Sequence, residues 1–117
     1  MFLILFVLNN PEKLDDLLTA WEGTGVGGAT IFPSSGLGRV RMKSGLWDDV
    51  PLIPSLEALF QHEEDFNRTL FTVVPDQDMV ERVVRATQQV VGDLSKPQSG
   101  LLVVLPVTQA YGLEKKP

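Results

Sequence analysis

Apolar residues follow the chain in two kinds of pattern, continuous runs and helical repeats. The continuous runs at 2–8 and 101–106 are typical of strands that are covered on both faces. Between residues 14 and 21, apolar side chains recur at i, i+3, i+4 and i+7, which places them on one face of a helix. These side chains are Leu14, Leu17, Leu18 and Trp21. The chain is therefore expected to open with a strand, followed by an amphipathic helix.

The first helix has its own start and stop signals. Asn10 can cap it with a side-chain oxygen, and Pro11 suits the first helical position, where an N–H is not needed. Glycines at 23, 25, 27 and 28 follow, then a short strand at 29–33. A phosphate-binding loop is the alternative, but no Gly-Lys-Ser/Thr follows, and helix and strand come in the reverse order. The glycines are interpreted as helix-ending and turn residues.

The first unit repeats later in the chain. A strand is expected at 69–74 and a second helix from Asp76 to about Val91. Matching residues lie at a constant offset of 66: Leu8 with Val74, Asn10 with Asp76, Leu14 with Val80, Leu17 with Val83, and Leu18 with Val84. Two tandem units predict an α+β fold, the ferredoxin-like β-α-β-β-α-β sandwich, with a four-stranded antiparallel sheet and two helices on one face. Other copies of the chain are expected to cover the second face.

A long insertion at about 39–67 separates strands 2 and 3. Connections of this length are usually functional or disordered. Disorder would require few large apolar residues, yet this segment contains Leu46, Trp47 and Phe60 among others. We expect it to pack on a surface of its own oligomer or of a partner.

Composition and charge narrow the classes of function. The 117 residues are expected to form one domain, 1–117. With a net charge of -5, the chain is not expected to present a basic surface for nucleic acid or to bind an anionic membrane surface. The absence of cysteine excludes disulfides, thiolate zinc sites and cysteine nucleophiles. The run at 2–8 has neither the flanks of a signal peptide nor the length of a membrane span, so a cytoplasmic protein without direct membrane insertion is predicted.

Candidate catalytic and metal chemistry is sparse. Ser34-Ser35 has no histidine partner in sight, so no nucleophilic triad is indicated. The His62-Glu63-Glu64-Asp65 run has metal-ligand types but no spaced second and third ligands, which favours a solvated charged face. Arg39, Arg41 and Lys43 form either a charge-protected strand edge or an anion site at the root of the loop, and both remain open. Neither an enzyme nor a metal site is predicted.

Several motifs together carry a family resemblance. Gly36-Leu37-Gly38-Arg39 resembles the Gly-Phe-Gly-Arg at the root of the T-loop in the P-II signal-transduction family. Val73-Val74-Pro75-Asp76, with the helical run at 80–84, resembles the third strand and second helix of that family, and Val104-Leu105-Pro106-Val107 its last strand. Thr30 stands where the second strand of the family has a threonine.

This resemblance implies a homotrimer with an adenine nucleotide in clefts between subunits. It also implies a T-loop that docks on a membrane transporter or a metabolic enzyme. The ligand-binding residues that we expect from it are Thr30, Gly36, Leu37, Gly38 and Arg39, with Lys96, which lies close to the family's lysine but out of register. Those of the partner-docking loop are Arg41, Lys43 and Trp47.

The chain also departs from the family pattern. The family's Gly-Asp-Gly-Lys before the last strand reads Pro97-Gln98-Ser99-Gly100, and its C-terminal arginines are replaced by Lys115 and Lys116. Val40 replaces the usual glutamine, and Tyr111, the only tyrosine, is not in the loop, so uridylylation is not expected. The expected effector therefore either differs from ATP or is missing. The alternatives are a ligand-free trimeric scaffold and a metal-tolerance protein of the CutA kind, whose motifs are not found.

Overall fold

The computed structural model describes residues 1–36 and 67–113. The elements in chain order are β1 (Phe2–Leu8), the 3-10 helix η1 (Pro11–Lys13), α1 (Leu14–Thr24), β2 (Thr30–Ser34), β3 (Asn67–Val74), α4 (Gln77–Val91) and β4 (Leu101–Pro106). Most of the long insertion lies outside the described residues, and only Asn67 at its end is described, as the first residue of β3. In the described part of the chain, neither helix is long and apolar enough to cross a bilayer.

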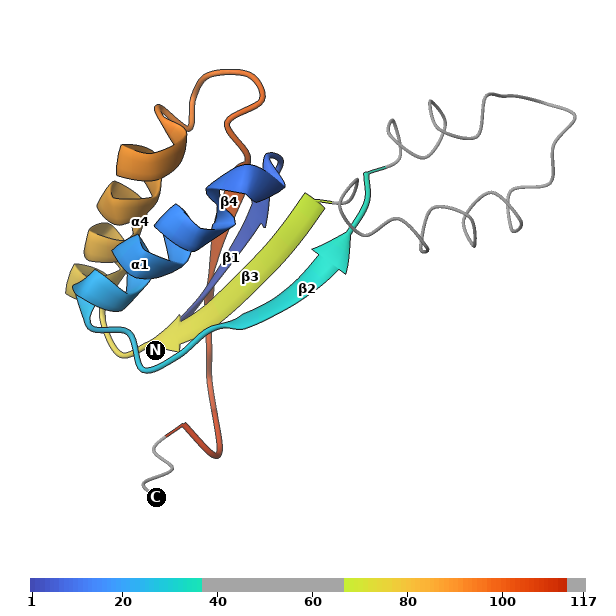
Figure 1. The fold of residues 1–117 in the computed structure, drawn as a ribbon. Helices are drawn as coiled ribbons and strands as arrows, with labels where there is room; N and C mark the ends of the chain where they lie inside the picture. Colours follow the sequence, from blue (N-terminus) through green and yellow to red (C-terminus); the bar gives the residue numbers. More distant parts are fainter. Residues whose placement is uncertain (37–66, 114–117) are drawn as a thin grey trace, which may run out of the picture.

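The four strands form one antiparallel sheet in the order β2-β3-β1-β4. Both helices lie on the same face of this sheet (Figure 1). The structure thus confirms the ferredoxin-like α+β fold. The bounds of two strands differ from the sequence prediction: β2 starts and ends one residue later, and β3 starts two residues earlier, at Asn67.

The core lies between the helices and the sheet. Alternate residues of β1 and β3 face the helices and are fully or almost fully buried: Ile4, Phe6, Leu8, Leu70 and Val74. Of the seven apolar helix residues singled out in the two repeated units, four are buried: Leu17, Trp21, Val80 and Val83. The other three, Leu14, Leu18 and Val84, are partly buried and pack against this cluster. The helical spacing in the sequence therefore identified the correct faces of both helices.

Asn10 and Asp76 occupy equivalent positions, but only Asp76 caps its α-helix directly. Asn10, which was expected to cap the first helix, caps the 3-10 helix η1 instead, and α1 has Lys13 at its N-cap without a side-chain hydrogen bond. The Asn10 side-chain oxygen accepts a hydrogen bond from the backbone N–H of Glu12 (3.1 Å), and the Asp76 carboxylate accepts one from the N–H of Met79 (3.0 Å). After Asn10 the chain first makes the 3-10 turn η1 and only then α1. α1 ends at Gly25, whose φ of 99° is a left-handed conformation that glycine adopts without strain.

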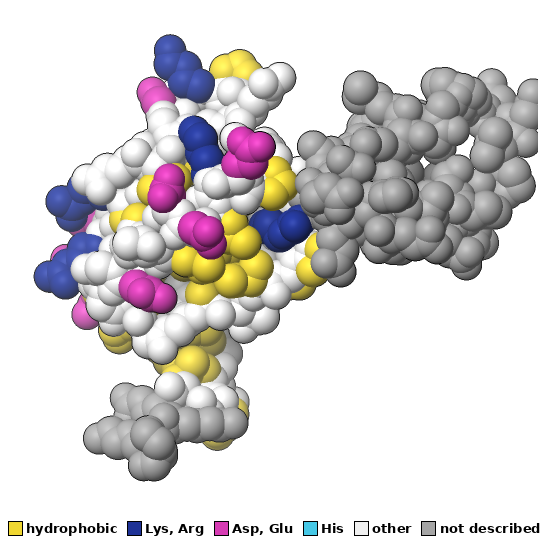
Figure 2. Space-filling model, viewed as in Figure 1, with side chains coloured by type: hydrophobic (Ala, Val, Ile, Leu, Met, Phe, Trp, Pro, Cys, Tyr) yellow, Lys and Arg dark blue, Asp and Glu magenta, His cyan; other side chains and the backbone are white. Residues whose placement is uncertain are grey.

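The sheet face opposite the helices is apolar, and neither helix covers it. We call it the open face. Residues paired across neighbouring strands share a face, so the register assigns to it the apolar residues Leu3, Leu5, Val7, Phe32, Phe71, Val73, Leu101, Val103 and Leu105. The same register adds the polar residues Thr30, Ser34, Asn67 and Thr69. Phe32 is 42% exposed, Leu101 59% and Leu105 46%. By contrast, charged side chains of both signs spread over the helix side (Figure 2).

Candidate functional site

A polar hollow of about 700 Å³ lies at the end of the sheet from which the long insertion leaves. The described residues that line it are Asn9, Asn10, Gly36, Asn67 and Gln98, and we call it the amide-lined hollow. Antiparallel pairing builds it. Leu8 is paired with Arg68 and Ser34 with Asn67, so the last residue of β1, the first residues of β3 and the last residue of β2 lie at the same end of the sheet. The α4–β4 loop adds Gln98.

This loop is held by its own hydrogen bonds. The Asp93 carboxylate accepts from the backbone N–H of Ser95 (2.9 Å) and from its hydroxyl (2.8 Å). Both bonds lower the pKa of the Asp93 carboxyl because they favour its charged form, and the bond from the backbone N–H has the larger effect. Further along, the Ser99 hydroxyl donates to the carbonyl of Lys96 (2.8 Å). The loop therefore enters β4 in a defined conformation.

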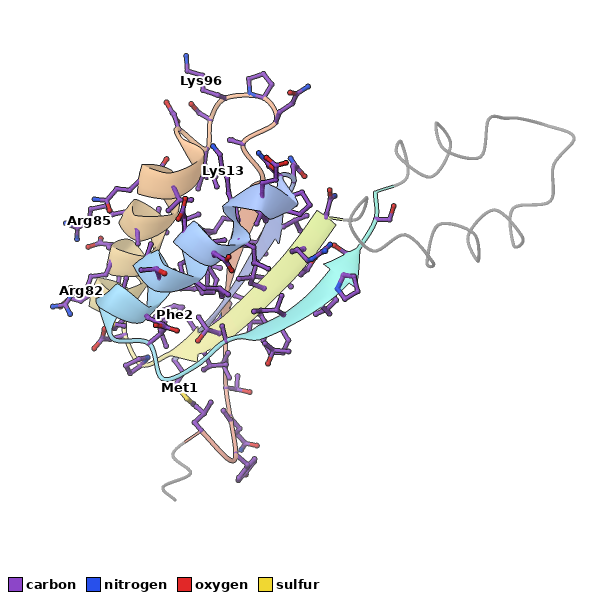
Figure 3. The ribbon with its side chains drawn as sticks, in the orientation of Figure 1. Met1, Phe2, Lys13, Arg82, Arg85 and Lys96 are labelled. Atoms are coloured by element: carbon purple, nitrogen blue, oxygen red, sulfur yellow. The ribbon has the colours of Figure 1, made fainter. Side chains whose placement is uncertain are left out.

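Gly100 presses the end of the loop against β1. Its φ is +114°, and a Cβ placed there would lie 2.6 Å from a ring atom of Phe6 and 2.7 Å from the carbonyl oxygen of Val7. In the alignment suggested by the resemblance, the lysine of the family's Gly-Asp-Gly-Lys falls at this position. The backbone leaves no room here for any side chain. Lys96, four residues earlier, instead stands exposed at the tip of the loop (Figure 3) and does not line the hollow.

A second hollow, of about 670 Å³, lies at the other end of the sheet. Its lining is largely apolar and consists of Met1, Gly27, Gly28, Ala29, Thr30, Phe71, Thr72, Val73, Val74, Pro75, Gly112 and Leu113. We call it the tail-side hollow. The hydroxyl of Thr72 donates to the carbonyl of Gly28 (2.6 Å), which ties the glycine-rich connection to β3. Sequence reasoning assigned these glycines to turns, and Gly27 and Gly28 have no positive φ.

The predicted ligand-binding residues are divided between these places. Thr30 is exposed and lines the tail-side hollow, whereas Gly36 lines the amide-lined hollow. Six residues of extended chain span roughly 20 Å, so one subunit does not bring Thr30 and Gly36 to the same small ligand. Lys96 lies at the opposite end of the molecule from Met1 (Figure 3). The remaining predicted residues lie outside the described part of the chain: Leu37, Gly38, Arg39, Arg41, Lys43 and Trp47.

Sequence reasoning missed the amide side chains that the fold gathers at the loop root. Asn9, Asn67 and Gln98 come from three separate segments, and only the register of the sheet brings them together. A usable signal was present, since Asn9 directly follows the apolar run at 2–8 and Asn67 lies two residues before the strand expected at 69–74. Nearby, the hydroxyls of Ser34 and Thr69 are hydrogen-bonded to each other at 2.7 Å. The open face is therefore polar at this end.

Metal and catalytic candidates do not come together in the part of the chain that is described. Within residues 1–36 and 67–113, no group of three or more His, Cys, Asp or Glu side chains is placed to hold a metal ion. His62 and the acidic residues after it lie outside these ranges. Since His62 is the only histidine of the chain, the described segments contain no histidine that could activate Ser34 or Ser35.

Comparison with known families agrees with this architecture. The model of the family described as nitrogen regulatory protein P-II matches residues 1–116. Among individual proteins of curated function, none matches the chain. Because the family match covers the two helices and all four strands, the chain belongs to the P-II family of nitrogen regulatory proteins, which act in signal transduction and not as catalysts.

Proposed function

We propose that this protein is a P-II regulator that forms a homotrimer and binds a small anionic effector between its subunits. Through the segment at about 39–67 it would control a partner, a membrane transporter or a metabolic enzyme. The observation that carries the proposal is the open face. P-II proteins generally form homotrimers and bind partner proteins. A cytoplasmic location is part of the same proposal.

The open face is suited to an interface between copies of the chain. Its central positions, among them Leu3, Leu5 and Phe71, are partly exposed although their strands lie inside the sheet. Fully burying one side chain of this size contributes about 1.5–3 kcal/mol. A face with this many apolar side chains is larger than monomeric soluble proteins usually leave in contact with water. Closed symmetry would let three copies cover one another's open faces.

Assembly would also explain why the predicted ligand residues are divided. Thr30 and Gly36 lie at opposite ends of β2, and in a cyclic trimer different patches of neighbouring subunits meet. We propose that Thr30 of one subunit faces the loop root of the next, residues 36–39, with Lys96 as a further contact for an anion. An adenine nucleotide is the effector that we propose to test first. Arg41, Lys43 and Trp47 are the proposed partner contacts.

Sedimentation and loop fluorescence test this function. The unaltered chain should sediment as a trimer at micromolar concentration. Trp21 is buried, so in a Trp21→Phe variant Trp47 is the only tryptophan left. Its emission should change on titration with an adenine nucleotide, and Arg39→Ala should remove the change. A folded monomer would contradict the assembly, and an emission that no nucleotide alters would contradict the effector.

A ligand-free trimeric scaffold is the second candidate. One observation favours it: among the described residues, no lysine or arginine lines the amide-lined hollow. Thermal unfolding distinguishes the two candidates. A ligand that binds only the native state stabilises it by about 2.7 kcal/mol at a hundredfold excess over its Kd. A trimer whose unfolding temperature no nucleotide raises would be the scaffold.

A further inference from the structure

The helix side of the sheet is not fully covered at the edge strand β2. Ile31 pairs with Leu70, which is fully buried on the helix side, so Ile31 points to that side too. Pro33, two residues later in the strand, points the same way. Ile31 is nevertheless 38% exposed, and Pro33 is exposed as well. The helices therefore leave the apolar side chains of this strand open to solvent.

α1 adds two partly buried leucines to this region. The helix lies between α4 and β2 (Figure 1). Lys13, directly before it, donates to the carbonyl of Val90 at the end of α4 (3.3 Å), so this flank faces α4. Leu14 and Leu18, one helical turn apart, lie toward the other flank, on the β2 side. The apolar surface that results, the α1–β2 patch, consists of Leu14, Leu18, Ile31 and Pro33.

Acidic side chains border the patch along α1. Asp15 lies three residues before Leu18 and Glu22 four residues after it, so both carboxylates are neighbours of Leu18 on the helix surface. In the described part of the chain, neither carboxylate has a salt-bridge partner. Figure 2 shows a hydrophobic area on this side of the molecule with acidic side chains beside it. Arg68, which is paired with Pro33, lies at the far end.

An amphipathic helix fits this surface better than an extended strand. Proline is tolerated in an edge strand where its nitrogen faces solvent, so the outer edge of β2 lacks a donor at Pro33 and is a poor template for an added strand. A docked helix binds instead through apolar side chains at i, i+3, i+4 and i+7. Lysine or arginine residues next to these positions would meet Asp15 and Glu22.

We propose that the α1–β2 patch docks an amphipathic helix of a partner protein, with lysine or arginine residues along the border of its apolar face. The patch lies on the helix side of the sheet, so the proposed trimer, which buries the open face, leaves it accessible. This docking surface is separate from the segment at about 39–67, and binding to it does not require an effector.

A pair of designed peptides tests the proposed partner chemistry. The probe is a fluorescein-labelled helical peptide with leucines at i, i+3, i+4 and i+7 and lysines beside them. The comparison peptide has glutamates in place of the lysines. In fluorescence anisotropy with the full chain, the lysine peptide should bind at least about tenfold more tightly, because like charges at an interface oppose binding. Equal affinities would overturn the inference.

Two double variants remove the same charge at different places. Asp15→Asn with Glu22→Gln should weaken binding of the lysine peptide about fivefold or more. The matched control is Asp78→Asn with Glu81→Gln, which removes two exposed carboxylates from α4 and should change the Kd less than about twofold. Equal weakening by both double variants would mean that the peptide responds only to net charge, which would overturn the inference.

Two single variants test the apolar contact. Ile31→Thr should weaken binding about tenfold, because it removes an apolar anchor from the patch. Val104→Thr is the matched control: Val104 is also 38% exposed on the helix side, but it belongs to β4, at the opposite edge of the sheet. Unfolding curves of each variant verify that it is folded. Binding that Ile31→Thr leaves unchanged would contradict the proposed site.

Sedimentation separates this inference from contacts between copies of the chain. The variants of the α1–β2 patch should sediment like the unaltered chain. If Ile31→Thr or the double variant of α1 dissociates the assembly, the patch is an interface between copies and the inference fails. A monomer that still binds the lysine peptide through the patch would contradict the proposed trimer and support the docking site.

Discussion

The indole N–H of Trp21 donates to the hydroxyl oxygen of Thr87 at 2.9 Å, and the two residues, 66 positions apart, occupy equivalent places in the two repeated units. Trp21 is 1% exposed and Thr87 0%. The Thr87 hydroxyl in turn donates to the carbonyl of Val83 (2.7 Å). The Trp21 N–H and the Thr87 hydroxyl, both buried, thereby have hydrogen-bond partners. The bond between them joins α1 and α4 at equivalent positions of the two repeated units.

Removing this acceptor should destabilise the fold. Thr87→Val preserves the side-chain shape but leaves the buried Trp21 N–H without a partner, which should cost about 1–3 kcal/mol. The measurement is the free energy of unfolding in denaturant. Thr19→Val, at an exposed position on α1, is the control and should change stability far less. Equal stability of the two variants would show that the bond contributes nothing.

Two glycines should respond oppositely to alanine. Gly100→Ala places a methyl group against Phe6 and the Val7 carbonyl at a positive φ, so a loss of at least about 2 kcal/mol is expected. Gly23→Ala adds a methyl group with no atom within 4 Å, inside α1, and should stabilise by up to about 1 kcal/mol. Unfolding curves measure both. A neutral Gly100→Ala would mean that the α4–β4 loop moves freely away from β1.

Neighbouring residues of β4 test the proposed interface. Leu105 pairs with Leu3 on the open face, whereas Val104 pairs with the core residue Ile4 on the helix side. Their exposures are similar, 46% and 38%. Leu105→Lys should dissociate the proposed trimer, because it places a charge in an apolar contact, while Val104→Lys should leave it assembled. Sedimentation velocity decides. Dissociation by Val104→Lys alone would move the interface to the other face.

The contribution of Asp93 to the stability of the fold should depend on pH. Its pKa is lowered in the folded protein, so its contribution to stability is present at neutral pH and is lost as the pH falls through the lowered value. The difference in unfolding free energy between the unaltered chain and Asp93→Asn should therefore shrink below about pH 4. In a Ser95→Ala background, which removes one of the two donors, this pH dependence should be weaker. A difference that stays constant with pH would contradict the role of the charge.

The candidate site could be predicted only in part. Thr30 and Gly36 were predicted as ligand residues, but the fold places them in different hollows, at opposite ends of β2. The sequence of one chain does not show which surfaces of two subunits meet, so it could not indicate whether these residues belong to one site. Lys96 was predicted as a ligand residue because of its charge. The residue that fixes the position of the loop is Gly100, because its backbone lies so close to Phe6 that a side chain would not fit. A close contact of this kind, between a backbone and a side chain far away in the chain, cannot be read from the residue types alone.

The order of the strands and α-helices, the helix faces and the repeat were predictable from the sequence, because they depend on local periodicity. The 66-residue offset that relates Leu17 to Val83 also relates Trp21 to Thr87. That Asn9, Asn67 and Gln98 share one hollow follows instead from the folded sheet, since antiparallel register brings together residues far apart in the chain. The folded sheet also decided which strand residues form the open face. The apolar runs identify two-sided strands, but only pairing and helix placement distinguish one face from the other.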